Sequence, residues 1–120
     1  MSGLHVRRGD IAIVELDPTR GSEQRGTRPC LVVQNDVGNE NAPTTIVAPF
    51  TTSYGNQRYP FEVLVSADEC ALREDSVVLC SQLRTVSIDE RITEVIGSIP
   101  DERLAEVGTA LEYSLGLREV

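Results

Sequence analysis

The side chains best suited to chemistry gather in one connection, between Asp17 and Pro29. Its side chains include three arginines, a carboxylate, a hydroxyl and an amide that could act together, and these residues are Arg20, Arg25, Arg28, Glu23, Ser22 and Gln24. A guanidinium presents a planar fork of donors that matches phosphate oxygens, and a carboxylate accepts protons. A hairpin turn needs only about two to five residues. This longer polar connection is therefore either a solvated loop or a functional one.

Histidine and cysteine give little support for a metal or thiol site. The single histidine, His5, lies in an expected N-terminal tail, and none of the three cysteines forms a Cys-x-x-Cys pair. Cys30 and Cys80 lie in apolar runs, so each is expected to be a small buried side chain rather than part of a disulfide or a zinc site. Cys70 lies outside these apolar runs. We expect no metal and no cofactor.

Charge is distributed unevenly along the chain. Residues 1–60 hold six arginines and six acidic residues, net zero, whereas residues 61–120 hold five arginines and thirteen acidic residues, net −8. The overall charge would repel nucleic acid, so an RNA or DNA site must be a local arginine cluster in the first half. The acidic half either attracts a basic partner or only aids solubility.

A length of 120 residues predicts a single domain over residues 1–120. No apolar run approaches the roughly 18 residues of a membrane span. Residues 1–8 lack the apolar core of a signal peptide. We therefore expect a cytoplasmic protein that does not enter a membrane.

The spacing of apolar residues is mainly that of β-strands. Six strands are predicted, at residues 11–16, 29–34, 44–50, 61–65, 76–80 and 91–96. Residues 35–43 and 52–59 are rich in turn formers and are expected to be loops. Residues Ser66 to Glu69 resemble a capping box that opens one helical turn.

One longer helix is expected at the C-terminus. Ser98 resembles its cap, with Pro100 in the first turn and Asp101 three residues after the cap. An apolar stripe at helical spacing would pack on the core, and its members are Leu104, Val107, Leu111 and Leu115. Short strands with a terminal helix predict a mainly β fold, either a small curved barrel or a split sheet with a helical cap.

A set of short motifs extends in order over most of the chain. The motifs are Arg8-Gly-Asp-Ile11, Asp17-Pro-Thr19, Gly21-Ser-Glu-Gln24, Arg28-Pro29, Leu31-Val-Val-Gln-Asn-Asp36, Thr45-Ile-Val47 and Ser81-Gln-Leu-Arg84. Together they resemble the MazF/PemK family of toxin endoribonucleases from type II toxin–antitoxin systems. The combination of Gly-Ser-Glu-Gln with Arg-Pro at this spacing is the specific part of the resemblance.

The resemblance implies an SH3-like small β-barrel that acts as a homodimer. It also implies metal-independent, sequence-specific cleavage of single-stranded RNA, mainly mRNA, and neutralisation by a MazE-like antitoxin. The ribose 2′-hydroxyl would attack the adjacent phosphorus and leave a 2′,3′-cyclic phosphate and a 5′-hydroxyl. Dependence on the 2′-hydroxyl would make RNA, rather than DNA, the substrate.

Three residues carry over as candidate catalytic residues: Arg28, Glu23 and Thr51. Arg28 would stabilise charge on the phosphate, and Thr51 would donate a hydrogen bond to a phosphate oxygen. Glu23 would act as a base or orient Arg28, and the proton assignment stays open because arginine rarely loses its proton. The alternatives are a solvated Glu23 paired with Arg25 and a local turn bond at Thr51.

The other candidates are expected to contact RNA, and they are Ser22, Gln24, Arg20, Arg25, Thr52, Tyr59 and Gln82. Thr52 is the register alternative to Thr51, and Gln82 belongs to a segment that lines the RNA groove in relatives. Arg20 and Arg25 either contact the RNA backbone or are merely exposed. Tyr54 and Tyr59 lie in the expected 52–59 loop, where they would stack on bases and tune sequence preference.

Two other functions stay open at this point. A CcdB-like gyrase poison has a related fold but relies on a C-terminal Trp-Gly-Ile, whereas this chain has no tryptophan and ends Leu117-Arg-Glu-Val120. An inactive binding module of the same fold is disfavoured by the retained Glu23, Arg28 and Thr51.

Overall fold

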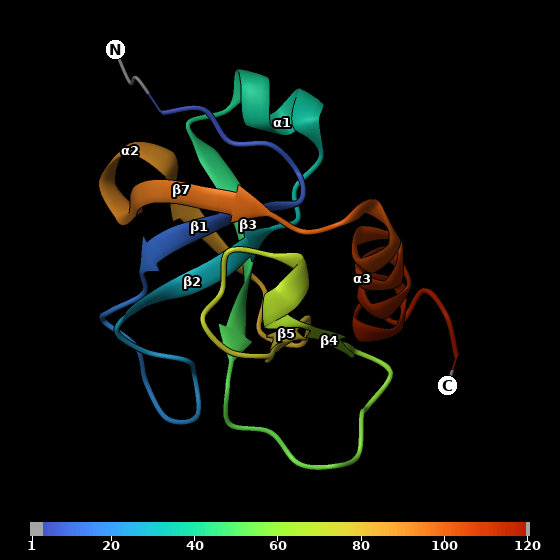
Figure 1. The fold of residues 1–120 in the computed structure, drawn as a ribbon. Helices are drawn as coiled ribbons and strands as arrows, with labels where there is room; N and C mark the ends of the chain where they lie inside the picture. Colours follow the sequence, from blue (N-terminus) through green and yellow to red (C-terminus); the bar gives the residue numbers. More distant parts are fainter. Residues whose placement is uncertain (1–3, 120) are drawn as a thin grey trace.

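The computed structural model describes residues 4–119, which form a bent sheet and a C-terminal helix (Figure 1). The strands are β1 (Asp10–Glu15), β2 (Thr27–Val32), β3 (Thr44–Thr51), β4 (Glu62–Val65), β5 (Ser76–Leu79), β6 (Arg84–Ser87) and β7 (Ile92–Ser98). The helices are α1 (Asp36–Asn41), α2 (Ile88–Arg91) and α3 (Asp101–Ser114), and a 3-10 turn spans Ala67–Glu69. The six predicted strands are all present, and the capping box at Ser66 and Glu69 is confirmed.

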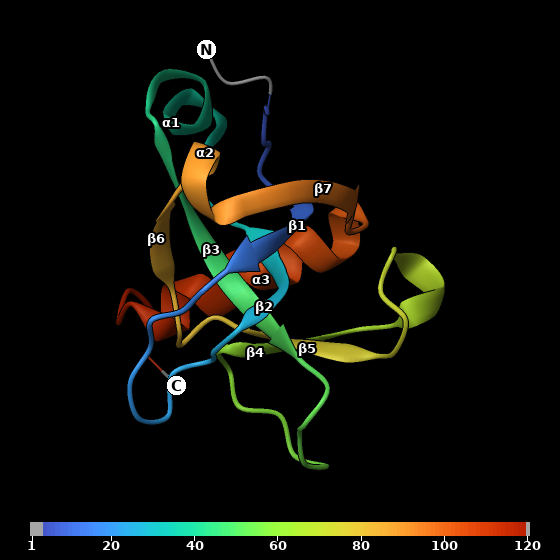
Figure 2. The same cartoon turned by 90° about the vertical axis from the view of Figure 1, so that its left-hand side faces the viewer.

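The strands pair antiparallel in the order β4-β5-β3-β2-β1-β7, and β6 pairs with β3. β3 is shared by two parts of the sheet, because its first residues pair with β6 and its last residues pair with β5. Figure 2 shows β4 and β5 turned away from β1 and β7 by this bend. The mainly β fold with a C-terminal helix is confirmed, in the form of an open, bent antiparallel sheet.

The central strands are buried on both faces of the sheet. Leu31 belongs to one core with Val107 and Ala110 of α3, whereas its neighbours Cys30 and Val32 belong to a second core on the opposite face. Two-sided burial explains why this part of the sequence is a continuous apolar run rather than an alternating one.

Cys30 and Cys80 are small buried side chains, as predicted. Burial raises the pKa of each thiol to about 12, so both stay protonated at neutral pH. Both of these cysteines and Cys70 are free thiols.

The expectation of a loop at residues 35–43 is wrong, because this segment contains α1. The Asn35 side chain caps α1 by accepting from the Gly38 main-chain nitrogen at 2.8 Å. Inside the helix, the buried Asn39 accepts from the hydroxyl of Thr45 at 2.6 Å. Asparagine and glycine favour turns and helix caps alike, so the composition alone did not separate the two.

The terminal helix is confirmed, but its start and its apolar stripe need correction. Ser98 ends β7, and Pro100 is the N-cap of α3, without a side-chain hydrogen bond. Leu115 lies past the last turn and is 60% exposed, whereas Ala110 is buried. The stripe therefore ends at Leu111, because the helix stops before Leu115 reaches the core. β6 and α2 were not predicted.

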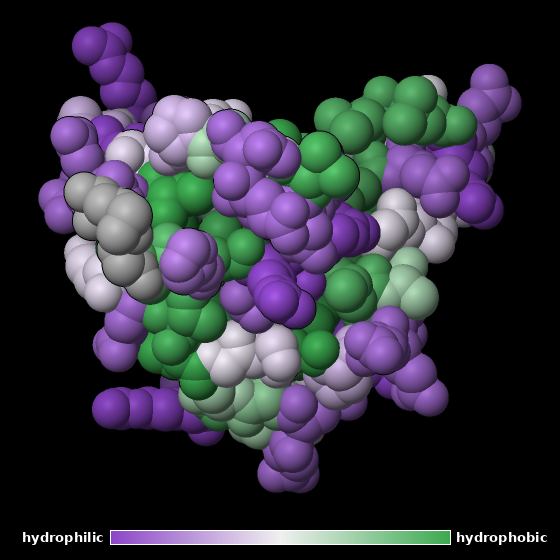
Figure 3. Space-filling view, turned by 90° about the horizontal axis from the view of Figure 1, so that it is seen from above, coloured by the Kyte–Doolittle hydropathy of each residue, from purple (hydrophilic) through white to green (hydrophobic). Residues whose placement is uncertain are grey.

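The two ends of the molecule carry different features, α1 at one end and two long loops at the other. Figure 3 views the end that carries α1, where apolar surface is broken up by polar side chains and Val37 is 73% exposed. The β1–β2 loop and the loop after β3 project from the opposite end (Figure 1). Within residues 4–119, no helix has the length and apolar character needed to cross a membrane.

Candidate active site

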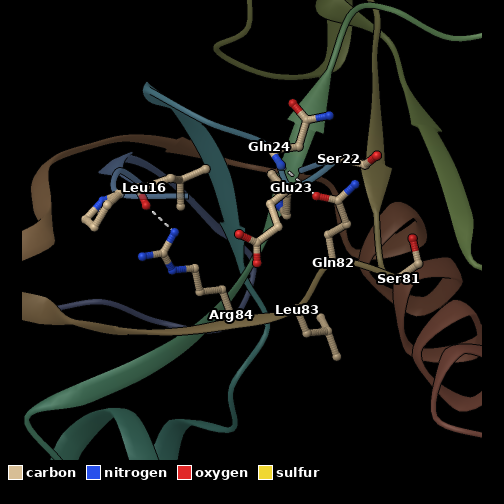
Figure 4. Close-up of a pocket in the computed structure, with 10 residues that line it drawn as sticks. Leu16, Ser22, Glu23, Gln24, Ser81, Gln82, Leu83 and Arg84 are labelled. Carbon is tan, nitrogen blue, oxygen red and sulfur yellow. Dashed lines mark hydrogen bonds between the residues drawn. The ribbon is translucent and has the colours of Figure 1, made fainter. Parts of the chain in front are cut away.

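A cleft of about 640 Å³ lies between the β1–β2 loop, residues 16–26, and the segment from Ser81 to Arg84 (Figure 4). Its lining residues are Leu16, Pro18, Ser22, Glu23, Gln24, Pro49, Ser81, Gln82, Leu83 and Arg84. Four predicted site residues meet here from two distant parts of the chain: Ser22, Glu23, Gln24 and Gln82. The Gln82 Oε1 atom accepts from the Gln24 main-chain nitrogen at 2.8 Å, which joins the two walls.

Arg28 lies beside this cleft, at the start of β2, and its guanidinium is fixed by three acceptors. Nε donates to the Arg25 carbonyl at 3.0 Å, and Nη1 donates to Oε1 of Gln24 and, at 3.4 Å, to the Phe50 carbonyl. Gln24 therefore links Arg28 to Gln82. This connection could not be seen in the sequence, because it depends on side-chain conformation.

Thr51 is the last residue of β3, the strand that pairs with β2 through Cys30 and Pro49. The Arg28 Nη1 atom donates to the carbonyl of Phe50, the residue before Thr51, at 3.4 Å, so the guanidinium contacts the end of β3. The Thr51 hydroxyl accepts from the Ser53 main-chain nitrogen at 3.1 Å, so the local turn bond considered as an alternative is present.

Glu23 points into the cleft on the side of Arg84 (Figure 4). Its Oε1 atom accepts from the Arg20 main-chain nitrogen at 2.6 Å, and its own nitrogen donates to the Arg20 carbonyl at 3.2 Å. Among the described residues no ion pair joins Glu23 to Arg25, whose Nη2 donates to the Gly21 carbonyl instead. The carboxylate thus closes a turn of the loop while remaining exposed.

The other candidates do not line the cleft. Arg20, Arg25 and Thr52 are exposed. Tyr59 is 55% exposed and stacks on Phe61, with ring centroids 5.4 Å apart. Its outer face is thus available to a base. The guanidinium of Arg58 lies over the Tyr54 ring, with the Arg58 Cζ atom 4.8 Å from the ring centroid.

Arg84 is a charged residue of the site to which no role was assigned from the sequence. It lines the cleft, and its Nη1 donates to the Leu16 carbonyl. The sequence signal that could have pointed to Arg84 was its position two residues after Gln82, as a basic residue in the half of the chain that carries a net charge of −8. In the part of the chain that the structure describes, no three His, Cys, Asp or Glu side chains form a group that could hold a metal ion, and His5 is exposed.

The chain is similar to proteins of one family over most of its length. A family model described as "PemK-like, MazF-like toxin of type II toxin-antitoxin system" matches residues 7–115. Endoribonuclease EndoA from Bacillus subtilis (strain 168) is 42% identical over 112 residues, which cover 93% of this chain and 96% of the relative.

Solved structures agree with this match. The crystal structure of MazF (Form-I) from Deinococcus radiodurans is 29% identical, with a TM-score of 0.76, and the match covers 94% of this chain and 98% of that chain. The MazE-MazF structure (Form-II) from Deinococcus radiodurans is 25% identical, with a TM-score of 0.70, and the match covers 94% and 97%. Because the matched segment includes the β1–β2 loop and the opposite wall of the cleft, this chain belongs to the PemK/MazF family of toxins of type II toxin–antitoxin systems.

Proposed function

We propose that this chain is a single-domain, cytoplasmic endoribonuclease toxin that cuts single-stranded RNA, mainly mRNA, at short sequence motifs. The observation that carries the proposal is the contact of Arg28 with the end of β3 at Phe50, the neighbour of Thr51, next to a polar cleft that contains Glu23 and Gln82. Its 42% identical relative is named an endoribonuclease, which supports this function over a CcdB-like gyrase poison.

Cleavage follows from the chemistry of RNA itself. The ribose 2′-oxygen attacks the adjacent phosphorus and loses its proton to a base, while the bond from phosphorus to the 5′-oxygen breaks and that oxygen gains a proton. The products are a 2′,3′-cyclic phosphate and a 5′-hydroxyl, and the reaction consumes no water and needs no metal.

Arg28 stabilises the negative charge that develops on the phosphate oxygens. Its Nε and Nη1 atoms are already hydrogen bonded within the protein, so the guanidinium is oriented before RNA binds. Preorganised donors of this kind often contribute more to the rate of an enzyme than any other single effect. The Ser53 nitrogen fixes the Thr51 oxygen, while the hydroxyl proton makes only a 3.4 Å contact with the Ser53 carbonyl and can turn to a phosphate oxygen.

Glu23 is the base in this proposal. Two roles were open for it, and the contacts favour the base, because Gln24, and not Glu23, holds the Arg28 guanidinium. The Glu23 carboxylate instead faces the cleft in which the ribose would lie.

RNA binding and regulation complete the proposal. Ser22, Gln24 and Gln82 contact RNA inside the cleft, and the exposed residues around it contact the flanking nucleotides; these are Arg20, Arg25, Thr52 and Tyr59. The toxin works as a homodimer, and a MazE-like antitoxin blocks the cleft. The solved MazE-MazF structure of a family member supports such a partner.

The test is cleavage of a mixed pool of single-stranded RNA by the purified protein in EDTA, followed by sequencing of the ends. We expect cuts at one short motif, with cyclic phosphate on one side and a 5′-hydroxyl on the other. Transcripts of varied sequence that all stay intact would contradict the proposal, as would products with 5′-phosphates.

A further inference from the structure

Two arginines from the second half of the chain hold the point where β1 runs into the β1–β2 loop. Arg84 Nη1 donates to the Leu16 carbonyl, as Figure 4 shows, and Arg91 Nη1 donates to the carbonyls of Glu15, at 3.0 Å, and Asp17, at 2.6 Å. Three consecutive carbonyls are therefore tied to side chains 68 or more residues away in the sequence. These bonds fix the direction in which the loop leaves the sheet.

Apart from these arginines, the entrance of the loop is held by the buried side chain of Leu16 and by the Leu16 nitrogen, which donates to the Gly26 carbonyl at 2.9 Å. It is mostly exposed, and it contains two glycines with positive φ, Gly21 at 58° and Gly26 at 79°. Segments with few buried contacts open easily unless hydrogen bonds restrain them. At the far end, the bond between Gln82 and the Gln24 nitrogen restrains the loop.

We propose that Arg84 and Arg91 are positioning residues, which hold the loop so that Glu23 and Arg28 face the same phosphate. This inference rests on the proposed function, because it assumes that Glu23 and Arg28 act on RNA. A displacement of about 1 Å in a catalytic group can lower the rate by roughly 100-fold. Restraint of the loop entrance therefore affects turnover rather than the first encounter with RNA.

Substitution of Arg91 can distinguish a positioning role from direct binding of RNA. Arg84 lines the cleft, so its loss could also remove a phosphate contact. Arg91 belongs to α2 and is not among the residues that line the cleft, and its Nη1 atom bonds to the main chain of the loop. An effect of Arg91 on cleavage must therefore pass through the loop.

The experiment compares Arg91→Met, Arg91→Lys and Arg84→Met with the full-length wild-type protein. The control is Arg73→Met, which removes an exposed arginine that does not line the cleft. Amide hydrogen exchange without RNA reports on the hydrogen-bonded loop nitrogens of Leu16, Glu23 and Gln24. Initial rates at several salt concentrations give kcat, KM and the salt dependence of KM.

We expect Arg91→Met to speed exchange at the loop nitrogens and to lower kcat by about 10-fold to 100-fold. Its KM and salt dependence should stay close to wild type. Arg91→Lys should recover part of kcat, because lysine keeps one donor for the carbonyls. Arg84→Met should speed exchange in the same way, and Arg73→Met should match wild type.

Unchanged exchange in both methionine variants would overturn the inference. Faster exchange with wild-type kcat in Arg91→Met would overturn it too, and so would a weaker salt dependence, which indicates a direct phosphate contact. If Arg91→Met fails to fold, Arg91→Lys carries the same test. A wild-type protein that does not cut RNA would reject the proposed function, while hydrogen exchange would still decide whether the arginines hold the loop.

Discussion

Arg28 is the side chain on which the proposed chemistry depends most. Its fork is oriented by Gln24 and by the Arg25 and Phe50 carbonyls before substrate arrives. Arg28→Ala should lower kcat by roughly 10²–10³-fold, because one oriented donor group is lost. Arg28→Lys keeps the charge without the fork, so it should recover only part of the rate. Initial rates on a fluorogenic RNA, with a thermal melt to check folding, measure both. Cleavage at the wild-type rate by Arg28→Ala would reject this assignment.

Thr51 allows a test that separates its hydroxyl from its shape. Thr51→Val keeps the volume but removes the acceptor of the Ser53 nitrogen and the donor proposed for phosphate. We expect a stability loss of about 1 kcal/mol from the broken hydrogen bond, and a fall in kcat beyond what that loss explains. Thr51→Ser should keep most of the activity. Equal activity of the two variants, each shown folded by urea denaturation, would leave Thr51 with only its turn bond.

At the scale of elements, the sequence predicted strands better than it predicted their short connections. Two-sided burial gives β2 a continuous apolar run, which is recognisable without knowledge of neighbours. α1 was missed because Asn35 and Gly38 serve turns and caps equally. β6 spans only Arg84–Ser87, of which only Val86 is buried, so little periodicity marks it.

For the residues of the site, too, local motifs could be recognised in the sequence and long-range contacts could not. Arg28, Glu23 and Thr51 could be proposed from the sequence because local motifs mark them. The contacts that Gln24 and Arg84 make could not, because each joins two segments of the structure through a side chain. The bonds from Arg28 to Gln24 and from Arg84 to Leu16 are set by side-chain conformations that no spacing encodes.

Asp36, the first residue of α1, should make the stability of the protein depend on pH. The Arg8 main-chain nitrogen and then the Asn39 amide donate to the Asp36 carboxylate, and they hold the pKa of Asp36 below its usual 3.8. A lowered folded pKa means that the stabilisation is complete above the unfolded pKa and is lost as pH falls through the folded pKa. Asp36→Asn should therefore lower the urea midpoint at pH 7, and the gap from wild type should narrow towards pH 2.5. Glu40→Gln, at an exposed residue of the same helix, is the control. An equal difference in urea midpoint between wild type and Asp36→Asn at both pH values would contradict this account.

At the scale of the whole molecule, an acidic protein must bind an acidic substrate. The net charge is −8, yet the first 60 residues are neutral and hold six arginines. Arg20 and Arg25 stand exposed on the same loop that carries Glu23. We infer that RNA is attracted locally by this loop, against repulsion from the acidic second half. Added salt weakens the attraction and also screens the repulsion, so affinity should fall less steeply with salt than for a basic protein.

This arrangement predicts the salt dependence of RNA binding. Each phosphate neutralised on a single strand contributes about −0.7 to the slope of log affinity against log salt. Arg20→Gln should therefore make the slope shallower by about 0.7, and the double variant with Arg25→Gln by about twice as much. Fluorescence anisotropy with a 2′-O-methyl RNA, which cannot be cut, measures the slope free of turnover. Arg73→Gln removes the same charge from an exposed residue that does not line the cleft and should leave the slope unchanged. A double variant with the wild-type slope would mean that RNA is held by other groups, and the loop would lose its place as the source of attraction.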